Sequence, residues 1–353
     1  GAALARDARL VWIARNPEVA ERVADSLRAW SADPDRITLL EPRSSLPFER
    51  GELVVDESAG RVAALAAWGS GESRILVTSL LAALQNSADP TALVEGSLSL
   101  LPGTRMSLDE ATERVAALGY ERVPLVGGRG EYARRGGILD CFPAGAQAPM
   151  RVEWFGDEIE SIRSIDPATQ RSGAPLTRAL LLPASEFPLT AAVVLKAKRA
   201  AEAIAEKDGV ELSPALRADL ARWEASPTPE RGDGLEIWSP LIAPSRPLDQ
   251  FNGALVILDE PSELISSAES LARQSAERFD VLKTTRILPP SWPAPNSPEN
   301  QFPIRSKKPP PAEAAAAEAP AAPTACGATT PNRLGIAPTI CVVMGRMNFC
   351  SIR

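Results

Sequence analysis

The sequence predicts an α/β fold in which a doubly wound parallel-sheet domain is interrupted by a small α+β domain and followed by a Pro/Ala-rich tail. Three observations support this prediction. Strand-like and helix-like segments alternate over the first 85 residues, as they do in βαβ units. Short alternating runs typical of an antiparallel sheet follow, after which helices and a last apolar strand return. With 353 residues, of which 44% are hydrophobic, the chain can bury a sizeable core.

The first part of the parallel-sheet domain is expected at residues 1–88. Apolar runs suited to buried strands occupy residues 10–14, 36–40 and 74–79. Asn16 is suited to cap, and Pro17 to open, a helix that reaches Trp30. Residues 58–68 form a second expected helix. The chain begins at Gly1 with a helical pattern already under way, so we expect this end to be the edge of a fragment.

The inserted α+β domain is expected at residues 89–175. A strand is expected within residues 95–101, and Ser107 with Glu110 forms the S-x-x-E capping box of a helix that ends at Gly119. Alternating apolar and polar runs at residues 131–142, 150–155 and 158–165 then predict an antiparallel sheet. Gly156 and Asp157 are suited to a tight turn between the last two runs.

The second part of the parallel-sheet domain is expected at residues 176–283. Helical patterns cover residues 196–207, 214–224 and 262–282, and apolar runs that predict strands cover residues 235–242 and 254–258. Residues 284–353 hold much of the 33-proline total and predict a disordered linker and tail. Residues 326–353 show no sustained period, which leaves their role open.

Composition excludes several classes of function. The formal charge is -7, from 38 basic and 45 acidic side chains, which argues against a protein that mainly grips phosphate backbones. Histidine is absent, so the commonest general base and metal ligand is missing. The 4 cysteines have no C-x-x-C spacing, which favours reduced thiols over a zinc site or disulfides. We therefore expect a cytoplasmic monomer with no membrane span, no metal ion and no cofactor.

Asp259 and Glu260 form an acidic pair of the kind found in nucleotide hydrolases. Asp259 and Glu260 follow an apolar strand, as the acidic residues of a Walker B element do. The phosphate-binding loop G-x-x-x-x-G-K-[ST] is missing, and Lys283-Thr284 lies at a predicted helix end. We therefore predict a degenerate site in which Asp259 caps the following helix. The glycines of residues 127–130 are assigned to a hairpin turn.

Strand parity gives residues 151–155 two different faces. Val152 and Trp154 are expected in the core, whereas Arg151, Glu153 and Phe155 share the other side over about 13 Å. An aromatic side chain between charged ones is typical of a binding hot spot. The alternative places Phe155 beneath the hairpin turn, and the pattern alone leaves both options open.

The amino-acid sequence of the inserted domain resembles that of a known family. Its most specific segments are residues 135–140, 142–143, 155–159 and 166–172, and they resemble the UvrB-like module near the amino terminus of bacterial transcription-repair coupling factors (Mfd). The resemblance implies a helicase-like lobe without a nucleotide site and an inserted domain that binds UvrA. It assigns that contact to Arg135, Arg151 and Phe155, with Arg134 and Glu153 as lesser candidates.

Arg135 fits this assignment less simply than the other two. Strict alternation would place it with Leu139 and Cys141, away from Arg151. It reaches the Arg151 side only if Gly136 and Gly137 form a bulge, and Arg134 is otherwise the candidate.

The resemblance implies a non-catalytic adaptor that recruits UvrA in transcription-coupled nucleotide excision repair. The sequence would then stop before the RNA polymerase-binding and translocase domains, so that RNA polymerase and DNA would be partners only through domains absent here. Two alternatives stay open: a fragment of an ATP-dependent DNA translocase or helicase, and a divergent UvrB that binds damaged DNA.

Overall fold

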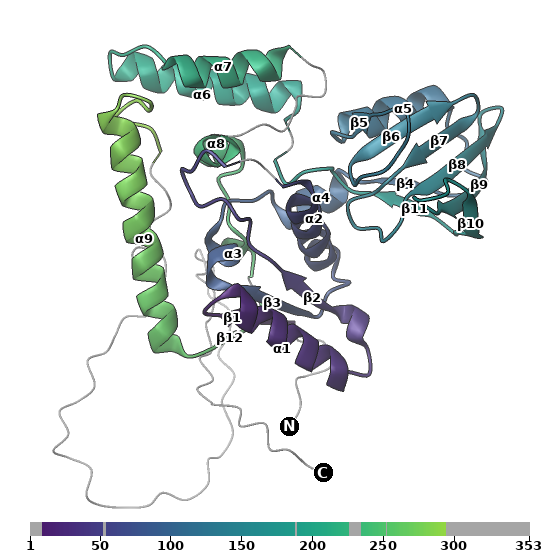
Figure 1. The fold of residues 1–353 in the computed structure, drawn as a ribbon, viewed down its shortest axis with the longest axis horizontal. Coiled ribbons are helices and arrows are strands. Elements are labelled where there is room, and N and C mark those ends of the chain that lie inside the picture. The colour runs from purple at the N-terminus through teal and green to yellow at the C-terminus, as the bar shows by residue number, and fades with distance from the viewer. Residues whose placement is uncertain (1–8, 52–53, 188, 226–233, 252, 294–353) are drawn as a thin grey trace, which may run out of the picture.

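The computed structural model describes residues 9–51, 54–187, 189–225, 234–251 and 253–293. A four-stranded sheet of order β12-β1-β3-β2 lies near its middle (Figure 1). All three neighbouring pairs are parallel. The strands are β1 (Leu10–Ala14), β2 (Ile37–Leu40), β3 (Ile75–Ser79) and β12 (Leu255–Leu258). Because β12 pairs with β1, segments from both ends of the described chain build one sheet.

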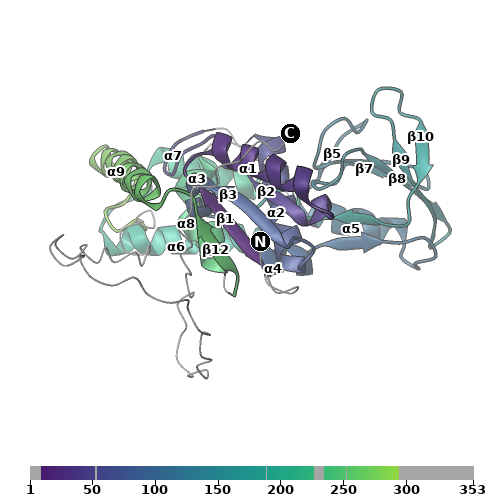
Figure 2. The same cartoon turned by 90° about the horizontal axis from the view of Figure 1, so that it is seen from below.

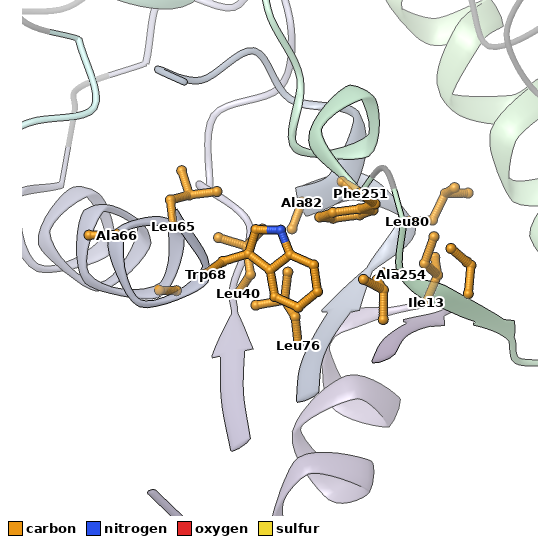
Figure 3. Packing of buried hydrophobic residues seen from close by; sticks show 14 of the residues in the cluster. Ile13, Leu40, Leu65, Ala66, Trp68, Leu76, Leu80, Ala82, Phe251 and Ala254 are labelled. Atoms are coloured by element: carbon orange, nitrogen blue, oxygen red, sulfur yellow. The ribbon is translucent and has the colours of Figure 1, made fainter. Parts of the chain in front are cut away.

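Helices cover both faces of this sheet, as the alternating pattern predicts. On one face α1 (Pro17–Trp30) packs Ala20 and Ala24 against the strands, and the Asn16 side chain caps the helix by accepting a 2.9 Å hydrogen bond from the Val19 amide. On the other face lie α2 (Val55–Ser70), α3 (Leu80–Leu84) and α4 (Pro90–Glu95). Trp68 of α2 fills the space between this face and Phe251 (Figure 3).

The chain between these two parts forms a six-stranded sheet of order β10-β9-β8-β7-β6-β5. Its strands are β5 (Glu121–Arg122), β6 (Glu131–Arg135), β7 (Ile138–Cys141), β8 (Met150–Phe155), β9 (Glu158–Ile165) and β10 (Ser172–Pro175). Helix α5 (Leu108–Ala117) packs on one face, and Ser107 caps it by accepting a 3.1 Å bond from the Glu110 amide. Strands β4 (Leu98–Leu100) and β11 (Ala179–Leu181) pair with each other where the chain enters and leaves this unit.

A helical cluster occupies the opposite end of the molecule from the six-stranded sheet (Figures 1 and 2). It consists of α6 (Ala191–Lys207), α7 (Pro214–Glu224), α8 (Leu235–Ile242) and the later half of α9 (Pro261–Thr284). Trp238 lies between Trp223 and Trp292, with ring centroids 5.2 and 5.3 Å away in edge-on contacts. Helices α6 and α7 therefore build a core of their own and do not extend the parallel sheet.

The expected strand at residues 235–242 is wrong, because these residues form the helix α8. Five consecutive residues from Leu235 to Ser239 are buried, including the charged Glu236, so this part of the segment has no exposed side. A short helix whose residues are mostly buried shows no amphipathic period, and its sequence pattern does not separate it from a buried strand. Among the described residues that follow the six-stranded unit, only β12 returns to the parallel sheet.

Other differences concern boundaries. The tail expected from residue 284 begins later in the described chain, because Leu288 and Trp292 are buried in the helical cluster. The rest of that tail, and the helical pattern at residues 2–4, lie outside the described residues. The domain limits at residues 88 and 175 stay predictions. No helix in the described ranges is long and apolar enough to cross a bilayer.

Candidate partner-binding face

The side of the six-stranded sheet that faces away from α5 is called the outer face here. Strands β6 and β7 are joined by a two-residue turn, since Arg135 pairs with Ile138 across Gly136 and Gly137. Gly136 has φ 56°, as the first central residue of a type II′ hairpin does. The expected run at residues 131–142 therefore consists of two strands. Gly136 and Gly137 form the turn between them and not the bulge that strict alternation required to bring Arg135 to the Arg151 side.

The turn brings Arg135 onto the outer face. Directly paired residues of antiparallel strands point to the same side. Arg135 pairs with Ile138, and Ile138 pairs with Glu153 on β8. The register thus places Arg135 on the same side as Glu153 and Arg151.

Strand β8 shows the predicted two-sidedness. Val152 and Trp154 are buried beneath α5, and the Trp154 Nε1–H donates a 2.8 Å hydrogen bond to the Met106 carbonyl. Phe155 is 80% exposed, so it does not lie beneath the β8–β9 turn. A register shift between Glu153 and Trp154 precedes Phe155, which pairs with Glu158 at the end of the hairpin.

Arg134 lies on the opposite side of the sheet. It pairs with Leu139, whose side chain is in the core under α5, and its guanidinium forms an ion pair with Asp109 of that helix. Arg134 therefore does not share a face with Arg151 and Phe155.

Arg151 is held by a buried carboxylate that sequence reasoning missed. Its Nε and Nη2 donate to the two oxygens of Asp140 at 2.7 and 2.8 Å, and its Nη1 donates to Ser172 Oγ at 3.3 Å. Asp140 is 3% exposed and lies directly opposite Arg151 in the register. The hydrogen bond that Arg151 donates to the Asp140 carboxylate raises the pKa of Arg151 above its ordinary value. The only sequence signal was an aspartate inside an apolar run, which favours a buried partner.

Arg135 and Glu153 have weaker restraints. Arg135 is exposed and donates from Nη2 to the Pro124 carbonyl at 2.6 Å, next to Leu125, which is 50% exposed. Glu153 accepts a 2.7 Å hydrogen bond from Ser161 Oγ. Both side chains stay within reach of a partner that approaches the outer face.

Part of the outer face is covered by its own chain. Val126 packs on Ala133 and Phe142, with Val123 and Ala146 at the edge of the cluster. Phe155 at the β8–β9 turn remains uncovered, as do the exposed residues around it. A partner can therefore reach the outer face from the end that carries the two hairpin turns.

Glu260, the second residue of the acidic pair after β12, has a local ion-pair partner. Glu260 and Glu263 both form ion pairs with Arg15, which follows β1. The cap position of α9 is Glu260 with φ 49°, so the expectation that Asp259 caps this helix is wrong. Asp259 instead donates its amide to the Ile13 carbonyl at 3.0 Å and continues the pairing of β12 with β1.

The glycines at residues 127–130 do not form the expected hairpin turn, because the strands on either side of them, β5 and β6, are parallel. The amides of Gly127 and Gly128 both donate to the Glu131 carboxylate, at 2.8 and 2.7 Å. This loop therefore already holds an anion from its own chain.

Comparison with known proteins identifies the part of the chain that carries the outer face. Residues 98–187 match the family described as the UvrB interaction domain. The chain contains a UvrB interaction domain. These residues start at β4 and end after β11, so the family match covers the six-stranded sheet together with α5.

The relatives found are transcription-repair-coupling factors. The chain is 27% identical to that of Escherichia coli over 80% of its length and 29% identical to that of Bacillus subtilis over 74%. It is 36% identical to that of Mycobacterium tuberculosis over 48%. It spans 24% of the first two relatives and 14% of the third. The resemblance to the UvrB-like module of this family is confirmed.

Proposed function

We propose that the UvrB interaction domain of this chain binds UvrA through the open end of its outer face, and that the chain is a non-catalytic adaptor in transcription-coupled repair. The observation that carries the proposal is the position of Phe155. It is 80% exposed, on the same face as Arg135 and Arg151.

An exposed phenylalanine at the end of a hairpin is costly to leave in water and favourable to bury. Aromatic and arginine side chains supply most of the binding energy at protein interfaces, especially where neighbouring groups exclude water around them. Ile138 is half-buried on the same face and extends the apolar surface toward Arg135. A partner with an apolar pocket and carboxylates at its rim would match this arrangement.

The two arginines have different roles in this proposal. Arg151 is 18% exposed in its side chain and uses two donor groups on Asp140, so it orders the strands beneath the contact as well as facing the partner. Arg135 bonds only a backbone carbonyl among the hydrogen bonds described for its side chain. Its guanidinium therefore keeps donors for the partner.

The pairing of Arg15 with Glu260 and Glu263 supports the non-catalytic part of the proposal. These residues lie at the ends of the adjacent strands β1 and β12, where a nucleotide would be held in an α/β sheet. An arginine already bound to Glu260 competes with the use of that carboxylate as a ligand for Mg²⁺.

The test measures binding of the full chain to UvrA by calorimetry. Phe155→Ala should weaken binding about 30-fold, as expected for a buried aromatic anchor. Arg135→Ala should weaken it about fivefold, because an exposed charged contact is worth less.

Matched controls exist elsewhere in the chain. Trp30 at the end of α1 is 85% exposed, and Arg114 of α5 lies on the other side of the domain with a 49% exposed side chain. Trp30→Ala and Arg114→Ala should bind UvrA like the unchanged chain. If Phe155→Ala and Arg135→Ala also bind like the unchanged chain, the outer face is not the contact.

A further inference from the structure

Arg163 of β9 stands directly opposite Arg151 of β8. Paired positions on antiparallel strands bring side chains close together on one face, and like charges in such pairs destabilise the sheet. Arg163 is exposed and therefore lies on the outer face beside the contact residues of the proposed function. The pairing of two arginines at this point therefore opposes the stability of the sheet.

The buried carboxylate neutralises only one of the two arginines. Both oxygens of Asp140 accept hydrogen bonds from Arg151, at 2.7 and 2.8 Å. Within the described residues Arg163 forms no ion pair, and its other neighbour in the register is Pro175. Arg163 is thus an exposed cation directly opposite a second cation, without an ion pair among the described residues.

We propose that Arg163 is a specificity-determining residue that pairs with a carboxylate on the acidic surface of the protein partner. The inference rests on the proposed function, because it concerns the same face and the same partner, UvrA. Phe155 lies further along β8, about 13 Å from Arg151 by strand geometry. Arg163 therefore selects partners that carry a carboxylate at some distance from the pocket that receives Phe155.

The charges around Arg163 favour a protein partner over a nucleic acid. The hairpin that carries Phe155 also carries Asp157, Glu158 and Glu160, all exposed, and Glu153 lies on the strand before it. Four carboxylates beside the aromatic ring would repel a phosphate backbone. A protein can place a carboxylate at Arg163 and basic or neutral groups beside the hairpin.

The test compares Arg163→Ala and Arg163→Glu in the full chain by binding to UvrA at several salt concentrations. Arg163→Ala should weaken binding about threefold to fivefold and reduce its salt dependence. Arg163→Glu should weaken binding at least about tenfold, because it faces the partner with a like charge. The thermal midpoint of Arg163→Ala should be unchanged or higher, since the repulsion with Arg151 is removed. A merely structural arginine would lower it.

The outcomes separate this inference from the proposed function. If Phe155→Ala loses binding while Arg163→Glu binds like the unchanged chain, the inference is wrong and the proposed function stands. If the unchanged chain does not bind UvrA, both are wrong. If the unchanged chain binds a DNA duplex and Arg163→Ala abolishes that binding, Arg163 selects phosphates and the acidic protein partner is wrong. Arg178→Ala, at a site with a 56% exposed side chain, is the control.

Discussion

The carboxylate of Asp140 lies beneath the outer face, and both of its oxygens accept hydrogen bonds from Arg151. A buried carboxylate is tolerated only with a charged or hydrogen-bonding partner, because its desolvation is costly. The pair therefore holds β7 and β8 in register from the side that a partner would approach. If a variant without Arg151 binds its partner more weakly, two effects contribute: the contact of Arg151 with the partner is lost, and the sheet beneath the contact is less stable.

Arg151→Ala should destabilise the six-stranded sheet by about 3 kcal/mol, since it leaves Asp140 buried without its partner. Hydrogen exchange of the β7 and β8 amides measures this local free energy of opening. Arg151→Gln combined with Asp140→Asn removes both charges and should recover most of the loss. Equal exchange rates in Arg151→Ala and the unchanged chain would show that the pair does not stabilise these strands.

At the scale of elements, the sequence correctly predicted the strands, helices and buried positions that depend on a local residue pattern. The alternation in β8 correctly separated Val152 and Trp154 from Phe155. Strands β1, β3 and β12 followed from short apolar runs, and α1 from its cap. The choice between a bulge and a turn at Gly136 could not be made, because glycine suits both and only cross-strand pairing separates them. Asp140 was missed for the same reason, since its partner is on another strand.

Two glycines offer a matched test of backbone conformation. A methyl group added at Gly60 of α2 or at Gly136 would meet no atom within 4 Å, and only Gly136 has a positive φ, 56°. Gly60→Ala should therefore stabilise the protein by about 0.5–1 kcal/mol, as in other helix interiors. Gly136→Ala should destabilise it by about 1–2 kcal/mol.

Thermal unfolding and hydrogen exchange of α2 and of β6 and β7 measure the two effects separately. Gly136→Ala should also loosen the placement of Arg135 and weaken UvrA binding, whereas Gly60→Ala should leave binding unchanged. A Gly136→Ala variant as stable as the unchanged chain would contradict the turn geometry.

At the scale of the whole molecule, a buried cluster of charges connects three regions of the chain. Glu186, which follows β11, forms ion pairs with Arg43 after β2 and with Arg61 of α2, and Arg43 also pairs with Glu236 of α8. All four side chains are at most 5% exposed. The cluster thus lies where the exit from the UvrB interaction domain meets the parallel-sheet region and the helical cluster.

The pKa shifts within the cluster show how its charges depend on one another. Burial lowers the pKa of Arg43, but the carboxylates of Glu186 and Glu236 outweigh this effect and raise it above its ordinary value. Burial lowers the pKa of Arg61, and the attraction of Glu186 opposes this without reversing it. Burial also raises the pKa of Glu236. Glu186 is the carboxylate shared by both arginines, so its charge is the one whose removal affects most of the cluster.

Glu186→Gln should destabilise the junction by about 3–5 kcal/mol, because two buried arginines would then share only Glu236. Hydrogen exchange of α2, α8 and residues 182–187 should rise together, since the cluster connects them, whereas the strands β7 and β8 should be protected as before. The control is Glu224→Gln, which breaks the exposed Lys198–Glu224 pair of 2.8 Å and should leave the stability and the exchange rates close to those of the unchanged chain. Exchange that rises only at residues 182–187 would show that the cluster does not couple the three regions.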